Sequence, residues 1–143
     1  MCNMWIDVIA EADCPFDIIF VVDQSSSVAA GNFNRTKNFL SALVGKLDIV
    51  SGTTRVGFVK FSHDVDTAEA FNLDAYSTVA GVQSAISSLT YGRGTTNTAA
   101  ALRYVRTTML TSAAGDRPDV ANTVVVLTDG RSDNKSATLV CTV

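Results

Sequence analysis

The stretch FDIIFVVDQSSS, residues 16–27, joins a nearly continuous apolar run to a carboxylate and three serines. An apolar run of this kind is typical of a β-strand that is covered on both faces, as in a parallel sheet. Asp23 ends the run, and Ser25 and Ser27 follow at alternate positions, so that their oxygens can face one point. The stretch therefore predicts a buried parallel strand that ends in an oxygen-rich loop.

The rest of the chain alternates predicted strands with predicted helices. Thr54–Phe61 and Thr123–Leu127 indicate two further strands, the second of them buried. Ala68–Leu73 indicates a short strand, and the short turn before it favours an antiparallel hairpin. Apolar residues three and four positions apart predict helices around Phe33, Leu40, Leu43, Val44 and Leu47, around Val79, Val82, Ile86 and Leu89, and around Leu102, Val105 and Met109. This alternation predicts an α/β domain with a mostly parallel sheet.

Length and composition narrow the function classes. The chain has 143 residues, the size of one domain, and 47% of them are apolar, enough for a substantial core. A net charge of −3 disfavours sequence-independent binding to nucleic acid or to an anionic membrane. No apolar run approaches the roughly 20 residues that span a bilayer. Residues 1–14 lack the basic start of a signal peptide, and we treat them as an extension before a domain at 15–143.

Oxygen-bearing side chains follow two of the predicted strands. Asp23 ends the first strand, and Asp129 follows the Thr123–Leu127 strand in the turn Thr128-Asp129-Gly130. In open α/β sheets the functional residues gather at the carboxyl ends of the strands. If these two strands are neighbours, the two carboxylates share one rim and repel each other unless a positive charge lies between them.

A metal ion is the first of three chemistries that such a rim can support. Thr96, at the start of the helix predicted after the glycines, adds a hydroxyl, so that the candidate ligands are Asp23, Ser25, Ser27, Thr96 and Asp129. All five are oxygen ligands, which favour hard cations. The set therefore predicts Mg²⁺, with Mn²⁺ or Ca²⁺ as alternatives.

Catalysis and phosphate binding are the competing interpretations. A serine nucleophile needs a base, and the only histidine, His63, lies in a turn, where a solvated role is the simpler interpretation. The glycine-rich stretch at residues 92–96 could hold an anion on its amides, but it lacks the lysine of a P-loop. A metal-assisted hydrolase would also need a general base, and none is evident.

Four segments resemble the von Willebrand factor type A domain, also called the integrin I domain. Residues 16–28 resemble the first strand and its D-x-S-x-S loop, and residues 55–62 resemble the second strand. Residues 91–102 resemble the threonine loop, and residues 128–133 resemble the aspartate loop. The segments occur in the family's chain order and cover roughly residues 15 to 134. The resemblance implies a Rossmann-like, doubly wound, mostly parallel sheet with one short antiparallel edge strand.

The resemblance also implies a metal-ion-dependent adhesion site. Ser25, Ser27 and Thr96 would then bind Mg²⁺ directly, and Asp23 and Asp129 would act directly or through water. An Asp or Glu of an extracellular protein partner, such as collagen or another matrix protein, would complete the shell. The expected function is a non-enzymatic, cation-dependent adhesion module that is secreted. The alternative is a structural module of matrix assembly without strict metal dependence.

The chain departs from the family in its length. Only residues 131–143 follow Gly130, too few for the helices and two strands that the resemblance implies there, so we expect a truncated domain that lacks the last strands. The Thr123–Leu127 strand would then be an unprotected edge with apolar side chains on both faces. Many extracellular members have a cysteine where Cys14 lies, and Cys141 is a candidate partner for it; Cys2 is the third cysteine.

Overall fold

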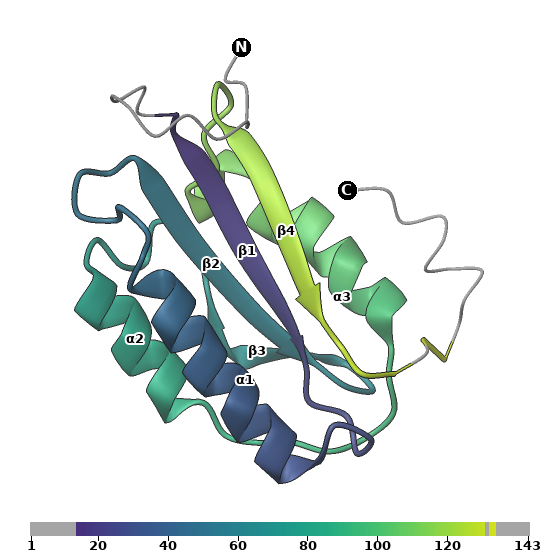
Figure 1. Cartoon of the computed structure of the whole chain (residues 1–143). Helices are drawn as coiled ribbons and strands as arrows, with labels where there is room; N and C mark the ends of the chain where they lie inside the picture. Colours follow the sequence, from purple (N-terminus) through teal and green to yellow (C-terminus); the bar gives the residue numbers. More distant parts are fainter. Residues whose placement is uncertain (1–13, 131, 134–143) are drawn as a thin grey trace.

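A four-stranded sheet with helices on both faces carries the functional loops (Figure 1). The computed structural model describes residues 14–130, 132 and 133. The strands are β1 (Phe16–Asp23), β2 (Thr54–Phe61), β3 (Val65–Phe71) and β4 (Ala121–Leu127). Their order is β3-β2-β1-β4, in which β1 runs parallel to both β2 and β4, and β3 runs antiparallel to β2. The prediction of an α/β fold with a mostly parallel sheet is therefore confirmed.

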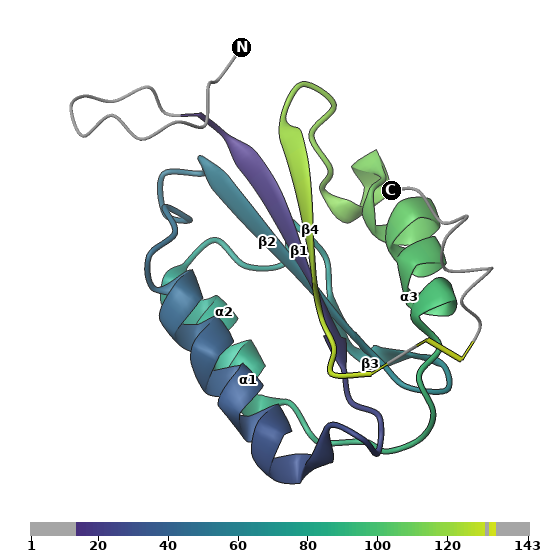
Figure 2. The same cartoon turned by 45° about the vertical axis from the view of Figure 1, so that its right-hand side comes forward.

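The helices lie in two layers that enclose the sheet. They are α1 (Ala29–Val44), α2 (Val79–Ser88), α3 (Thr98–Tyr104), the π-helical turn η1 (Val105–Met109) and the 3₁₀ turn η2 (Ser112–Ala114). Figure 2 shows α1 and α2 together on one face of the sheet and α3 on the other. The domain is thus doubly wound, as the resemblance implied.

The central strand β1 contributes side chains to both core layers. Phe20 packs with Phe33 of α1 on one face, and Val21 packs with Val105 on the other. All four side chains are buried, because a strand directs successive side chains to opposite faces. The continuous apolar run of β1 therefore follows from its position in the middle of the sheet, with a helical layer on each side.

Several boundaries differ from those expected, among them the end of β3, at Phe71 rather than Leu73, and the start of β4, at Ala121 rather than Thr123. β3 begins at Val65 rather than Ala68, because the amide of Ser62 donates to the carbonyl of Asp64 at 3.0 Å and closes a tight turn. Leu47 lies beyond α1, which ends at Val44. The helix predicted around Met109 is present, but its last turn is the π-helical η1.

Thr123–Leu127 lies in a strand, as predicted, but the prediction that this strand is buried is wrong. Within the described residues β4 is one of the two edge strands of the sheet, and its residues range from exposed to half-buried. The composition of β4 is apolar, but only β1 pairs with it among the described strands. The exposure expected for this edge is thus observed.

Cys14 is disulfide-bonded. Cys2 and Cys141 lie outside the described residues, so that the pairing of Cys14 with Cys141 stays a prediction. The division of the chain into an extension at 1–14 and a domain at 15–143 also stays a prediction.

Candidate functional site

The loops that follow β1 and β4 meet at one edge of the sheet, at the lower end of Figure 1. The pairing of β1 with β4 places Val22 opposite Leu127, the last residue of β4. Asp23 comes directly after Val22, and Asp129 lies two positions beyond Leu127. The two carboxylates therefore share a rim, as the sequence predicted for neighbouring parallel strands.

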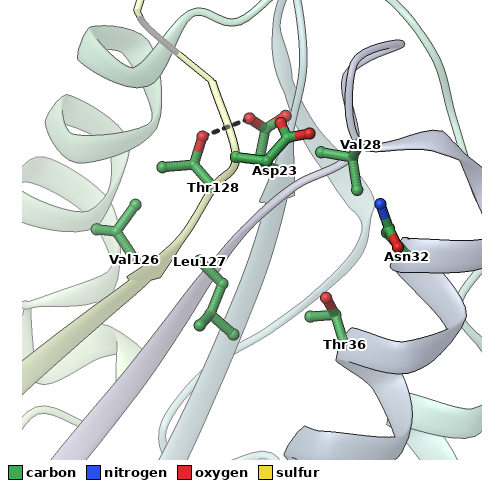
Figure 3. Close-up of a pocket in the computed structure, with 8 residues that line it drawn as sticks. Asp23, Val28, Asn32, Thr36, Val126, Leu127 and Thr128 are labelled. Carbon is green, nitrogen blue, oxygen red and sulfur yellow. Dashed lines mark hydrogen bonds between the residues drawn. The ribbon is translucent and has the colours of Figure 1, made fainter.

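Hydrogen bonds hold both carboxylate oxygens of Asp23. The amide of Ser25 donates to Asp23 Oδ1 at 2.7 Å, and Thr128 Oγ1 donates to Asp23 Oδ2 at 2.6 Å. Figure 3 shows the second of these bonds, which joins the end of β1 to the end of β4. Asp23 and Ser25 are each 1% exposed, so that the inner part of the site is shielded from solvent. The orientation of the Asp23 carboxylate is therefore fixed by its own loop and by the loop after β4.

A chain of hydroxyl contacts leads outward from Ser25. Ser25 Oγ and Ser27 Oγ are 3.0 Å apart, and Ser27 Oγ donates to Asp129 Oδ1 at 3.1 Å. A Cβ added at Gly130 would lie 3.4 Å from Ser27 Oγ and 3.6 Å from Thr96 Oγ1. The hydroxyls of Ser27 and Thr96 thus flank the same glycine. All five predicted site residues are brought together from three loops.

The backbone of Thr96 is held by a residue that the sequence reading did not single out. The amide of Thr96 donates to Asp133 Oδ2 at 2.9 Å, and the amide of Asp133 donates to the carbonyl of Thr96 at 2.9 Å. Within the described residues, the hydroxyl of Thr96 makes no hydrogen bond, so it is available to a ligand. α3 begins at Thr98 with Asn97 as its N-cap, so Thr96 precedes the helix.

The amides of the glycine-rich loop are already engaged, which argues against phosphate binding. The amide of Gly92 donates to Gln24 Oε1 at 2.8 Å, and the amide of Gly94 donates to Ser26 Oγ at 3.1 Å. In return, the amide of Ser26 donates to the carbonyl of Gly94 at 2.9 Å. A phosphate would have to displace these bonds together with the Thr96–Asp133 bond. The loop therefore serves to fix Thr96 against the loop after β1.

Histidine chemistry finds no support in the arrangement of the described side chains. His63 is exposed, and its Nδ1 lies 3.2 Å from Thr95 Oγ1. The imidazole thus contacts a threonine of the glycine-rich loop, whereas the serine hydroxyls of the site contact one another and Asp129. The solvated turn interpretation of His63 agrees with this placement.

The two site carboxylates have no counter-charge among the described residues. Lys60 of β2 is 1% exposed, but its Nζ lies 3.1 Å from Asp66 Oδ2 and 2.7 Å from Glu69 Oε2. Burial raises the pKa of Asp66 and Glu69, but the hydrogen bonds and charge of Lys60 outweigh it and leave both pKa values lowered. The charge of Lys60 is therefore neutralised by two carboxylates of β3. It does not offset the negative charge of Asp23 and Asp129 at the rim.

Thr128 and Asp133 are the functional positions that sequence reasoning missed. Thr128 immediately precedes Asp129 and holds Asp23, and Asp133 holds the backbone of Thr96. A threonine before a loop aspartate is an ordinary turn former, so local chemistry gave no reason to select it. The only available signal was that both residues belong to the segment that resembles the aspartate loop.

A hollow of about 290 Å³ opens beside Asp23 and Asp129, between α1 and β4 (Figure 3). Its lining combines the two carboxylates with polar and apolar side chains: Val28, Asn32, Thr36, Val126, Leu127 and Thr128. The rim is therefore open to solvent on this side.

The donor set fits a hard divalent cation. Two carboxylates and three hydroxyls supply oxygen only, and no three His, Cys, Asp or Glu side chains cluster as a metal site in the described residues. A cation bound here would thus depend on the hydroxyls of Ser25, Ser27 and Thr96 as well as on the carboxylates. It would also relieve the repulsion between Asp23 and Asp129.

Comparison with known proteins agrees with this geometry. The sequence model of the von Willebrand factor type A domain family matches residues 17–142 of this chain. The chain belongs to this family. The match includes all five candidate ligands, and it agrees with the family resemblance of the four sequence segments.

The relatives of this von Willebrand factor type A domain include proteins whose chains are much longer than this one. The collagen alpha-4(VI) chain of Mus musculus is 37% identical over 85% of this chain and 5% of its own length. Matrilin-1 of Homo sapiens is 34% identical over 82% of this chain and 23% of its own length. The chain thus spans less than a quarter of either relative.

A solved relative carries zinc in a metal-ion-dependent adhesion site (MIDAS) of its own. Proximal thread matrix protein 1 from the mussel byssus, solved with a zinc-occupied MIDAS motif, superposes with a TM-score of 0.77 at 30% identity. The alignment covers 87% of this chain and 33% of that protein.

In the part of the present chain that the structure describes, no helix has the length and apolar character needed to cross a membrane.

Proposed function

We propose that this domain is a non-enzymatic protein-binding module that takes an acidic side chain of an extracellular partner through a divalent cation. The observation that carries the proposal is the meeting of five oxygen-bearing side chains from three loops at one rim. The hydrogen bonds Ser27–Asp129 and Thr128–Asp23 join residues 102 and 105 positions apart, and this proximity of remote side chains supports the proposed site. The relatives among collagen and matrilin chains support a secreted matrix protein as the setting.

Each residue has a distinct role in the proposed site. Ser25, Ser27 and Thr96 would bind Mg²⁺ through their hydroxyls, with Mn²⁺ or Ca²⁺ as alternatives. Asp23 and Asp129 would supply negative charge directly or through water. When bound, the cation supplies an electrophilic position for one further anionic oxygen. Because three of the five protein ligands are neutral, that position keeps its attraction for a carboxylate of the partner.

Cation-linked stability tests the site without knowledge of the partner. A cation that binds only the folded protein at 100 times its Kd stabilises it by about 2.7 kcal/mol. We expect the midpoint of thermal unfolding to rise with Mg²⁺ relative to EDTA, and Asp129→Ala to abolish the rise. Asp119→Ala is the matched control, because Asp119 is likewise exposed but precedes β4, at the opposite end from the site. A midpoint of thermal unfolding of the wild type that does not change with Mg²⁺, Mn²⁺ or Ca²⁺ would overturn the proposal.

Binding to an immobilised matrix protein tests the second half of the proposal. With fibrillar collagen as the probe, we expect wild-type binding in Mg²⁺, loss of binding in EDTA and the same loss for Asp129→Ala. The alternative, a structural assembly module without strict metal dependence, predicts retention that is equal in Mg²⁺ and EDTA. Collagen and matrilin relatives are compatible with that alternative too, so the EDTA comparison decides between them.

A further inference from the structure

A second hollow lies beside the proposed cation site. It measures about 220 Å³, and its lining consists of Ser26, Ala29, Ala30, Tyr91 and Arg93. Ser26 stands between Ser25 and Ser27 in the sequence, so the hollow borders the loop that carries two of the proposed ligands. A partner that places a carboxylate on the cation would therefore bring its neighbouring residues over this hollow.

Arg93 is the only charged residue in the lining, and its charge is not used within the described structure. Its side chain is exposed and makes no hydrogen bond or ion pair with any described residue. The first turn of α1, which supplies Ala29 and Ala30, also contains no acidic side chain. The hollow therefore has a positive charge beside a rim whose own carboxylates would be neutralised by a bound cation.

The backbone that carries Arg93 is fixed relative to the serine loop. Its neighbours Gly92 and Gly94 are bonded through their amides to Gln24 and Ser26, at 2.8 and 3.1 Å. The hydroxyl of Tyr91 donates to the carbonyl of Ser25 at 3.0 Å. The Arg93 side chain thus projects from a segment whose position is set by the same loop that would hold the cation. This pre-organisation reduces the entropy lost when a partner binds.

We propose that Arg93 and this hollow bind a second acidic side chain of the same partner, which makes the module selective for segments with two nearby acidic residues. The inference rests on the proposed function and adds its specificity. A guanidinium group binds a carboxylate through two parallel hydrogen bonds, which fixes the direction of the partner segment. The small side chains of Ala29 and Ala30 leave room for the incoming carboxylate.

The two positions are close enough for one short peptide. Ser26 lines the hollow and adjoins both serine ligands, and consecutive Cα atoms are about 3.8 Å apart, so both positions border the same short loop. An extended peptide advances about 3.3 Å per residue. Acidic residues about two to four positions apart would therefore reach both positions.

Synthetic peptides separate this proposal from the proposed function. One peptide carries a single Glu in a neutral background, and three others carry a second Glu two, three or four positions away. Their affinity for the whole chain is measured in Mg²⁺ and in EDTA. The variants are Arg93→Ala and the control Arg106→Ala, which removes the same charge from an exposed position on η1.

In Mg²⁺ we expect the second Glu to tighten binding by about threefold to tenfold for the wild type and for Arg106→Ala at one or more spacings. Arg93→Ala should lose this gain and bind the single-Glu peptide as the wild type does. Equal affinity of all peptides for the wild type, or an undiminished gain in Arg93→Ala, with binding still abolished by EDTA, would overturn the role of Arg93 and leave the cation site standing. Binding that survives EDTA, or no binding of any peptide, would overturn both proposals.

Discussion

Replacing Arg117 with methionine should remove a large part of the folding free energy, because it leaves a buried carboxylate without its counter-charge. Asp17, the second residue of β1, is 0% exposed. Arg117 Nε donates to its Oδ1 and Oδ2 at 3.0 and 3.3 Å, and Nη2 donates to Oδ1 as well. The guanidinium also donates to the carbonyls of Gly52 and Thr53, at 2.7 and 3.0 Å. One side chain of the loop before β4 therefore joins β1 to the loop before β2, at the end of the sheet opposite the candidate site.

The expected magnitude follows from the burial of Asp17. Removing one partner of a buried ion pair costs about 3–5 kcal/mol, since the remaining charge has lost its compensation. Domains are stable by only about 5–15 kcal/mol in total. At roughly 3 °C per kcal/mol for a domain of this size, the midpoint of thermal unfolding of Arg117→Met should fall by about 10–15 °C.

A double-mutant cycle provides the assay. The free energy of unfolding is measured in urea for Arg117→Met, Asp17→Asn and the double variant, with the exposed Arg103→Met as control. We expect the double variant to be more stable than Arg117→Met alone, because the uncompensated charge is gone. Arg103→Met should change the free energy by about 0.5 kcal/mol or less. A loss below about 1 kcal/mol for Arg117→Met, or strictly additive effects in the cycle, would refute the reasoning.

Two further predictions concern backbone strain and acid stability. Ala29 has φ +62°, which is strained for a residue with a Cβ, so Ala29→Gly should raise the free energy of unfolding by about 1 kcal/mol. Ala30→Gly, the control, should lower it by up to about 1 kcal/mol. A urea titration in which both variants lose stability would contradict this. The pKa values of Asp66 and Glu69 are lowered from 3.8 and 4.5 on folding, so their stabilisation is present above the unfolded values and is lost as pH falls through the folded ones. Unfolding measured from pH 6 to about pH 3 should therefore depend less on pH in Asp66→Asn/Glu69→Gln than in the wild type, and Asp119→Asn should not reproduce that flattening.

Much of the fold could be predicted from β1 alone. Its unbroken apolar run required cover on both faces, and the structure provides α1 and α2 on one face and α3 on the other. The apolar composition of β4 led to a wrong prediction of burial. Composition indicates that a strand can be buried, but it does not indicate how many neighbouring strands it has. Strand order in the described sheet leaves β4 paired with β1 alone.

The sequence identified the five candidate ligands, whose role stays a prediction, but it did not identify the residues that hold them in place. Asp23, Ser25 and Ser27 are close in sequence, so their spacing in one loop already limits their geometry. The partners that hold them are remote: Thr128 reaches Asp23 across 105 positions, and Asp133 reaches Thr96 across 37. No local pattern identifies such a pair, because either residue alone is an ordinary loop residue.

The sequence by itself determined the strands, the helical faces and the oxygen-rich loops. This was possible because the direction of the side chains, and with it their burial, repeats with a fixed period along a strand or a helix. Only the tertiary structure decided which of those loops meet, that Arg117 neutralises Asp17 from 100 positions away, and that Arg93 lies beside the serine loop without an ion-pair partner among the described residues. These are contacts between segments remote in sequence. They depend on strand order and register, which the packing of the whole sheet sets and no short segment encodes.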